Sequence, residues 1–182
     1  HRCCRRQRQM CIRDSFLLFI FIAIPAFLYF ALDRESIDIN EFRLNSGYQE
    51  VKLSEGITSY KDIGDKNNKV IVLVHGATFG SLAYEEYVNV FLENNYRVIT
   101  YDQYGRGYSD RVHAEVSIEL MERQLKELIE HCEVEDLILY GVSFGAAVVA
   151  KYASNNPEKI SFIGYQVPVS YTHLTLPTTT PV

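Results

Sequence analysis

The five residues Gly141-Val142-Ser143-Phe144-Gly145 form the motif with the clearest chemistry in this sequence. The motif follows the apolar run LILY and opens the run FGAAVVAKYAS, so it joins an expected strand to an expected helix. A sharp turn there strains the serine backbone and lifts the hydroxyl above the sheet, while the glycines let strand and helix approach closely. We predict that Ser143 is a catalytic nucleophile. The alternative is a simple turn in which Ser143 caps the helix.

A second turn, Val74-His75-Gly76-Ala77, follows the apolar run VIVLV. Without a large side chain at Gly76, the chain can turn there and point a backbone N–H group at the same pocket. A serine that attacks an acyl group needs such donors where the oxyanion of the tetrahedral intermediate forms. We predict that the backbone N–H groups of Ala77 and Phe144 are these donors. His75 is expected to be structural rather than a catalytic base.

A third glycine-rich segment, DQYGRGYSD, begins at Asp102 and follows the run RVITY. It contains neither G-x-x-x-x-G-K-[ST] nor G-x-G-x-x-G, so it is not a phosphate-binding loop. We expect a tight, buried loop under the site, with Gly105 and Gly107 as part of a structural motif. Asp102 is expected to accept hydrogen bonds from backbone N–H groups rather than to act in catalysis.

Strands and helices are expected to alternate around these three turns. Continuous β-branched runs indicate strands buried on both faces of a parallel sheet, and amphipathic runs indicate helices. The expected strands are Val70–Val74, Arg97–Tyr101, Leu137–Tyr140 and Ile160–Tyr165, and the expected helices are Leu82–Glu93, Ser117–His131 and Phe144–Ser154. An antiparallel hairpin over Phe42–Leu53 and Thr58–Asp62 is expected before them. The predicted fold class is α/β, a three-layer α/β/α sandwich with a mostly parallel sheet.

Residues from about Phe42 to Pro168 resemble the N-terminal half of an α/β-hydrolase domain. HG after the third strand, D-x-x-G-x-G-x-S after the fourth and G-x-S-x-G after the fifth occur in that family's order. The resemblance is to serine hydrolases, among them monoglyceride lipases, lysophospholipases, carboxylesterases and carbon–carbon hydrolases. It implies Ser143 as nucleophile and Ala77 with Phe144 as the oxyanion hole. Haloalkane dehalogenases and epoxide hydrolases carry aspartate where this chain has Ser143, which argues against their chemistry.

The catalytic triad of such enzymes follows the order Ser, acid, His. After Ser143 the sequence offers Glu158 and, in its last segment, His173, and neither is predicted to act. His113 and His131 precede the serine and are expected at the surface. We therefore expect the triad acid and histidine to be absent from this fragment. The fragment alone is then expected to be inactive, because a serine without a base is a poor nucleophile, and its last strand should be an exposed edge.

The two ends of the chain differ from the rest. Arg5–Ser15 and Val169–Thr179 resemble translated adapter DNA from sequencing libraries. We expect residues 1–15 and 169–182 to be artefacts of that kind and leave them out of the fold. A genuine basic tail and a genuine polar tail are the alternative.

Phe16–Leu32 is a run of 17 uncharged, mostly apolar residues. As a helix it spans roughly 26 Å, slightly less than a bilayer core of about 30 Å. We predict a single-pass transmembrane anchor over residues 16–32, a linker over 33–41 and the hydrolase part over 42–168. A cleaved signal peptide and a buried core helix are the alternatives.

Composition narrows the function further. A net charge of −5 argues against a nucleic-acid partner, and four cysteines are too few for a disulfide scaffold. No ligand cluster has zinc-like spacing, so neither a metal nor an organic cofactor is expected. The predicted function is a membrane-anchored serine hydrolase that cleaves lipid-like or small acyl esters through an acyl-enzyme. The alternatives are an amide or carbon–carbon bond hydrolase of the same fold and a catalytically dead relative that binds a ligand.

Overall fold

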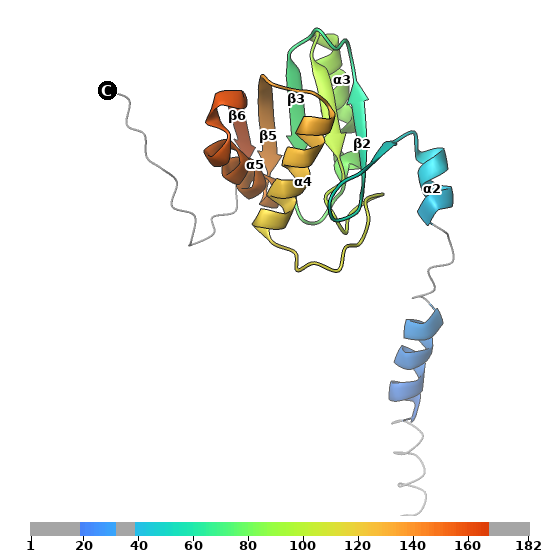
Figure 1. The fold of residues 1–182 in the computed structure, drawn as a ribbon. Helices are drawn as coiled ribbons and strands as arrows, with labels where there is room; N and C mark the ends of the chain where they lie inside the picture. Colours follow the sequence, from blue (N-terminus) through green and yellow to red (C-terminus); the bar gives the residue numbers. More distant parts are fainter. Residues whose placement is uncertain (1–18, 32–38, 168–182) are drawn as a thin grey trace, which may run out of the picture. The chain divides into compact units, whose positions relative to one another are not determined.

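The computed structural model describes residues 19–31 and 39–167. The chain divides into two units, His1–Glu41 and Phe42–Val182. In the first unit the structure describes a helix over residues 19–31, and helix α2 (Ile39–Ser46) begins there and ends in the second unit. The second unit contains the sheet and its helices, which Figure 1 shows as layers.

The sheet has six strands in the order β1-β2-β4-β3-β5-β6. The strands β4, β3, β5 and β6 run parallel to one another, whereas β2 pairs antiparallel with β4 and β1 pairs antiparallel with β2. Their bounds are β1 Gln49–Lys52, β2 Ile57–Ile63, β3 Val70–Val74, β4 Arg97–Tyr101, β5 Leu137–Val142 and β6 Ile160–Gln166. Because β3, β4 and β5 are parallel, the segments that follow them meet at one edge of the sheet.

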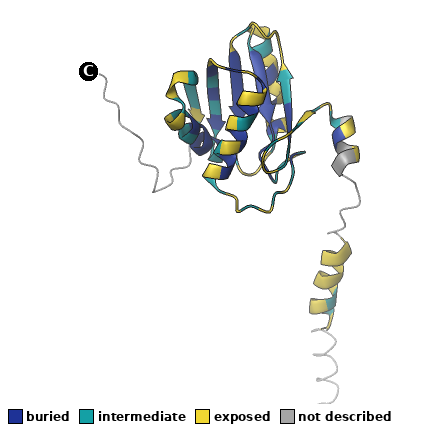
Figure 2. Ribbon diagram, viewed as in Figure 1, coloured by how far each residue is buried: buried dark blue, intermediate teal, exposed yellow. Residues whose placement is uncertain are grey.

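Helices cover both faces of this sheet. The alternate residues Val70, Val72 and Val74 pack with α4 (Ile118–His131) and α5 (Phe144–Asn155), whereas Ile71 and Leu73 pack with η1 (Ser81–Tyr84) and α3 (Glu85–Glu93). Strand β3 therefore sits at the centre of the core, and Figure 2 shows its ribbon and that of β4 as buried. A short 3₁₀ turn, η2 (Pro157–Lys159), joins α5 to β6.

The sequence predicted most of these elements closely. Val70–Val74 and Arg97–Tyr101 are confirmed to the residue as β3 and β4. Helix α4 begins one residue later than expected because the Ser117 side chain caps it by accepting a hydrogen bond from the Leu120 N–H. The element expected as one helix from Leu82 is instead the 3₁₀ turn η1 followed by α3.

The expected antiparallel hairpin is confirmed as β1 and β2, but its first strand is shorter than expected, because residues 42–46 belong to helix α2. Helix α2 begins at Ile39, so it also includes the last residues of the predicted linker. Gly47 ends the helix with a φ of 73°, a left-handed conformation that glycine adopts without strain. The helix is tied to the rest of the domain by Arg43, which is 5% exposed and donates hydrogen bonds to Tyr108 O and Asp110 Oδ1.

The predicted membrane anchor is described only over residues 19–31, which form a helix whose large apolar side chains are exposed. Within the described ranges, no helix has both the length and the apolar character needed to cross a bilayer. Residues 16–18 and 32 of that anchor, and the predicted adapter-derived ends, lie outside the described residues.

Candidate active site

Ser143 stands at the turn between β5 and α5 in a conformation that L-residues rarely adopt. Its φ is 53° and its ψ is −117°, which costs on the order of 1–3 kcal/mol. The surrounding hydrogen bonds hold it there: its N–H donates to Gln166 O at 2.9 Å, and its carbonyl accepts from the Ala146 N–H at 3.0 Å. Its hydroxyl makes no hydrogen bond within the described part of the chain, nor does it cap α5.

Three glycines let the backbone segments around Ser143 approach one another. A Cβ on Gly145 would lie 2.2 Å from Val74 O, and one on Gly141 would lie 2.7 Å from Ala146 Cα. Both distances are shorter than real contacts, so only glycine allows α5 to pack this closely on β3 and β5. A Cβ on Gly76 would lie 3.8 Å from Ser143 Oγ, which places the loop after β3 directly beside the serine hydroxyl.

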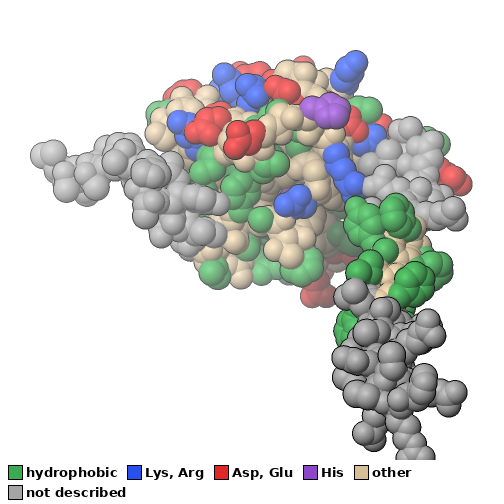
Figure 3. All heavy atoms as spheres, turned by 90° about the horizontal axis from the view of Figure 1, so that it is seen from below, with side chains coloured by type: hydrophobic (Ala, Val, Ile, Leu, Met, Phe, Trp, Pro, Cys, Tyr) green, Lys and Arg blue, Asp and Glu red, His purple; other side chains and the backbone are tan. Residues whose placement is uncertain are grey.

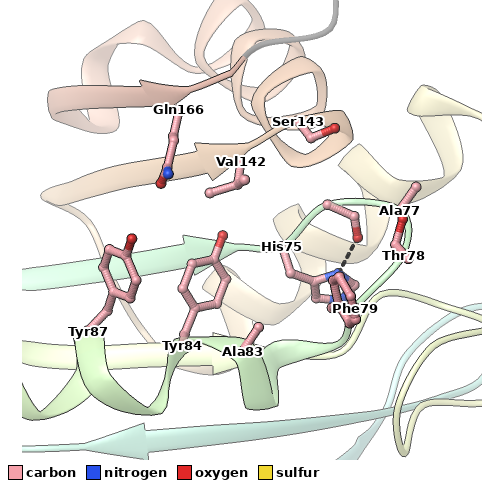
Figure 4. Close-up of a pocket in the computed structure, with 11 residues that line it drawn as sticks. His75, Ala77, Thr78, Phe79, Ala83, Tyr84, Tyr87, Val142, Ser143 and Gln166 are labelled. Carbon is pink, nitrogen blue, oxygen red and sulfur yellow. Dashed lines mark hydrogen bonds between the residues drawn. The ribbon is translucent and has the colours of Figure 1, made fainter.

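A cavity of about 250 Å³ opens beside Ser143. Figure 4 shows Tyr84 and Tyr87 rising into it from η1 and α3, and Gln166 entering from β6 on the other side. Tyr140, on β5, stacks near Tyr87 and donates a hydrogen bond to Gln166 Oε1 at 2.6 Å. The wall next to Ser143 is therefore aromatic and its position is fixed by hydrogen bonds.

The loop after β3 is held by side chains along its whole backbone. Four consecutive carbonyl oxygens each accept a hydrogen bond from a side chain. The pairs are Val74 O with Tyr84 Oη, His75 O with Gln103 Nε2, Gly76 O with His75 Nδ1 and Ala77 O with Arg106 Nε. Fixing every carbonyl also fixes the directions of the N–H groups between them, because each peptide unit is planar.

The hydrogen bonds of His75 define its tautomer. Its Nδ1 is 2.6 Å from Gly76 O, a carbonyl that can only accept, so Nδ1 carries the proton. Its Nε2 then accepts from the Gln103 N–H at 2.8 Å. Burial lowers the pKa of His75, and the charge of Arg106 acts in the same direction against the Gly76 carbonyl and Asp102. The ring is thus neutral and both nitrogens are engaged, which leaves none for proton transfer.

The hydrogen bond between His75 and the Gly76 carbonyl also fixes the direction of the Ala77 N–H group. The Gly76 carbonyl and the Ala77 N–H belong to one trans peptide unit and point in opposite directions. Because the His75 ring holds the carbonyl on one side, the N–H points to the other. Phe144 is the first residue of α5, and the N–H groups of a first turn point out of the N-terminal end of the helix. Figure 4 shows His75 bound to the loop that carries Ala77, with Ser143 facing that loop.

The loop after β4 is built around a buried carboxylate. Asp102 is 1% exposed and accepts hydrogen bonds from the Ser81 N–H at 2.7 Å, the Ser81 hydroxyl at 2.8 Å and the Tyr108 N–H at 2.9 Å. A Cβ on Gly107, whose φ is 48°, would lie 2.1 Å from its Oδ2. Asp102 therefore fixes the backbone between η1 and the glycine-rich loop. Gly105 has a φ of 76° and open space around it.

The described residues supply neither a base nor an acid for Ser143. His113 and His131 are exposed, and His131 Nε2 lies 3.0 Å from the Tyr60 hydroxyl at the far end of α4. Glu158 lies in η2 after α5, and His173 is outside the described residues. Over residues 19–31 and 39–167, no group of three His, Cys, Asp or Glu side chains could hold a metal ion.

Several residues of the site were not found from the sequence. Arg106 and Gln103 hold the loop after β3, but a charged and a polar residue in a glycine-rich segment carry no signal of that role. Gln124 did carry a signal in the sequence, because a polar residue there interrupts the apolar stripe of α4. In the structure it is fully buried. It accepts from the Tyr104 N–H at 3.0 Å and donates to Asp102 O at 3.0 Å and Thr58 Oγ1 at 2.9 Å.

The comparisons with known proteins agree with this geometry. The model of the family described as serine aminopeptidase, S33, matches residues 65–165, which is more than half of the chain. The chain belongs to this α/β-hydrolase family. The match covers all three turns of the site and the strands that carry them, from the turn before β3 into β6.

The hydrolase is similar to several named proteins. It is 33% identical over 95 residues to a carbendazim hydrolyzing esterase of Nocardioides, covering 52% of this chain and 39% of that protein. It is 30% identical over 121 residues to 2-hydroxy-6-oxo-2,4-heptadienoate hydrolase of Pseudomonas putida, covering 64% of this chain and 43% of that protein. The crystal structure of a bromoperoxidase from Bacillus anthracis superposes with a TM-score of 0.61 at 29% identity, covering 65% of this chain and 44% of that one.

The hydrolase chain spans only part of each relative. It covers 33% to 40% of the length of the first curated relatives that it matches. The chain therefore corresponds to part of an α/β-hydrolase domain.

Proposed function

We propose that this hydrolase cleaves carboxylic esters through an acyl-enzyme on Ser143. The proposal rests on two neighbouring features. Ser143 is strained, and its hydroxyl has no hydrogen-bond partner among the described residues. The loop beside it has four carbonyl groups that each accept a hydrogen bond from a side chain. A strained position persists only where its surroundings enforce it, and such positions cluster at reactive sites.

The reaction has two steps. Ser143 Oγ forms a bond to the acyl carbon and gives its proton to a base, the oxyanion is stabilised by the N–H groups of Ala77 and Phe144, and the alcohol leaves with a proton. Water then attacks the acyl-enzyme and releases the acid. Because His75 is engaged on both nitrogens and the described acids lie elsewhere, the base and its partner must come from outside the described residues.

An ester is a better substrate for this site than a peptide N-terminus. An aminopeptidase must bind a charged amine, and a carboxylate is the natural partner for it. Among the residues that the structure describes, neither Asp nor Glu lines the cavity beside Ser143 or the one next to it. A volume of about 250 Å³ beside Ser143 suits a small acyl group. Amide and carbon–carbon bond cleavage are the alternatives within the same mechanism.

We also propose that residues 16–32 anchor the enzyme in a membrane. The support is the apolar run itself and the exposure of its large side chains, among them Phe21, Phe27 and Phe30, over the described helix. The full protein should then stay in the membrane pellet after a carbonate wash and appear in the supernatant when residues 16–32 are deleted. Wild-type protein in the supernatant contradicts the anchor and leaves the hydrolase proposal untouched.

The nucleophile is tested by labelling the full protein with a fluorophosphonate. We expect the wild type to be labelled, Ser143→Ala to remain unlabelled, and the modified peptide to contain Ser143. Ser154→Ala, on an exposed position of the same helix α5, is the matched control and should keep the label. A folded wild type that takes no label contradicts the enzyme and favours a catalytically dead binding protein.

A further inference from the structure

Arg106 lies at the edge of the site, and no acidic side chain within residues 19–31 and 39–167 pairs with it. Its Nε donates to Ala77 O and its Nη1 donates to Gly105 O at 3.0 Å. Among the described residues, Nη2 has no acceptor and no carboxylate forms an ion pair with the guanidinium. By contrast, the buried Arg43 and Arg97 both use Nη2 to bind a carboxylate, Asp110 and Asp62, at 2.6 Å.

The guanidinium lines a second cavity that adjoins the first. This cavity has a volume of about 240 Å³, and it shares Gly76 and Ala77 with the cavity beside Ser143. Its other walls include Phe144, Met121 and Val116, and none of the described acidic side chains lines it. Figure 3 views the domain from the carboxyl edge of the parallel strands. Hydrophobic side chains gather over the middle of that face, and the acidic ones lie mainly towards its rim.

We infer that Arg106 and this second cavity form a subsite for a carboxylate carried by the ester substrate. The inference rests on the proposed function and adds a substrate class to it. The reacting carbonyl sits at Ser143 with its oxygen between the N–H groups of Ala77 and Phe144. These two residues also line the second cavity. A substituent that passes them therefore reaches Arg106 across a short apolar stretch.

The geometry favours an anion over a neutral polar group. The two N–H groups on Nη2 need acceptors, and a hydrogen bond between a guanidinium and a carboxylate is roughly twice as strong as a neutral one. The apolar walls suit a spacer of a few carbon atoms, and the absence of acidic lining residues removes competition for the cation. The substrate class is an ester with an anionic end, such as a hemiester of a dicarboxylic acid or an acylated hydroxy acid.

The test compares matched anionic and neutral esters in the full protein. One pair carries the charge on the alcohol, 4-acetoxybenzoate against 4-acetoxybenzamide, and the other carries it on the acyl group, 4-nitrophenyl hemisuccinate against 4-nitrophenyl butyrate. In one of the pairs, Arg106→Gln should lower kcat/KM for the anionic ester about tenfold or more beyond its effect on the neutral one. Arg106→Lys keeps the charge and should keep most of the preference. Arg123→Gln removes an exposed cation elsewhere and should leave the ratio unchanged.

Two outcomes overturn the subsite. If Arg106→Gln lowers both members of each pair by the same factor, Arg106 only positions the Ala77 loop. The second measurement needs no turnover: benzoate binding to Ser143→Ala, followed by NMR titration, should be lost when Arg106→Gln is added. Equal binding by the two variants overturns the subsite as well. If the full protein cleaves no ester but this benzoate site depends on Arg106, the proposed function fails and the subsite stands.

Discussion

The turn after β5 and the loop after β4 lie at the same edge of the sheet, yet each holds its serine differently. Ser109 is 2% exposed, and its hydroxyl donates to Asp102 O at 2.6 Å and accepts from the Ser59 N–H at 3.0 Å. Ser143 is partly exposed, strained and without a hydroxyl partner among the described residues. The difference shows which polar residues a fold uses for itself and which it leaves available for chemistry.

The two titratable side chains next to the site, Asp102 and His75, resemble Ser109 rather than Ser143 in this respect. Asp102 and His75 are buried and fully hydrogen-bonded, and each fixes a loop. Buried polar groups that are completely paired rigidify their surroundings, whereas leaving one unpaired costs about 1–3 kcal/mol. The strain at Ser143 is therefore borne by a scaffold in which the neighbouring polar groups are satisfied.

Replacing each of the two serines by alanine, in separate variants, should give the largest difference between an effect on activity and an effect on stability. Ser143→Ala should lower kcat/KM of the full protein by about 10⁴-fold or more, with the free energy of unfolding within about 0.5 kcal/mol of the wild type. Ser109→Ala should cost about 1–3 kcal/mol of stability, because Ser59 N–H and Asp102 O lose a buried partner. Its activity per folded molecule should stay near the wild-type level. Ester hydrolysis measures the activity and urea denaturation measures the stability. A loss of stability in Ser143→Ala together with a loss of activity in Ser109→Ala would contradict the comparison.

Gly145→Ala tests the close approach of α5 to β3. Its new Cβ would lie 2.2 Å from Val74 O and 2.5 Å from His75 O, both backbone atoms that cannot move aside. We expect a loss of more than about 4 kcal/mol, seen as failure to accumulate folded protein. Gly105→Ala is the control: its Cβ meets nothing within 4 Å, and only its φ of 76° is unfavourable. Gly105→Ala should lower the free energy of unfolding by about 1–2 kcal/mol in urea denaturation. Equal losses of stability in both variants would argue against a close approach of α5 to β3 at Gly145.

Arg43→Ala tests whether the contact between α2 and the loop after β4 stabilises the domain. Burial acts to raise the pKa of Asp110, but the hydrogen bond and charge of Arg43 and the bond from the Ile57 N–H leave it lowered. Losing this buried pair should cost about 1–3 kcal/mol. Arg123→Ala, which breaks an exposed pair with Glu55, should cost less than about 0.5 kcal/mol. Urea denaturation at neutral pH compares the two, and equal effects would mean that α2 is held by other contacts.

His75 predicts a pH dependence of stability. Its pKa is lowered in the folded state, so the unfolded chain binds the proton first as the pH falls. Above its ordinary pKa of 6.5 both states are neutral, and stability should decline as the pH falls from there towards the folded pKa. His75→Asn removes the titration and should show a flatter curve over that interval. The measurement is the free energy of unfolding against pH, and an unchanged slope would contradict the neutral buried ring.

The sequence predicted the elements whose reasons are local. The run VIVLV is apolar throughout and RVITY is mostly apolar because β3 and β4 are buried on both faces, so both were recognisable without their neighbours. Helix α2 was missed because its stability comes from a distant contact: Arg43 binds Asp110, which lies 67 residues away. A helix of eight residues with a weak apolar stripe has no comparable local signal.

The site divides in the same way. The motifs around Ser143, Gly76 and Asp102 could be found because glycines mark the places where backbone segments must approach closely. The hydrogen bonds from Arg106 and Gln103 could not, because they depend on where the loop after β4 meets the loop after β3. The expectation that the triad acid and histidine are absent from this fragment stays a prediction.

The most direct test is a crystal structure of the full protein after reaction with a small alkyl fluorophosphonate. The account predicts phosphorus bonded to Ser143 Oγ, with one phosphoryl oxygen about 2.7–3.1 Å from both the Ala77 N and the Phe144 N. It also predicts that His75 still contacts Gly76 O and Gln103 N. An adduct whose phosphoryl oxygen faces solvent or other donors, or an adduct on another residue, would contradict the account.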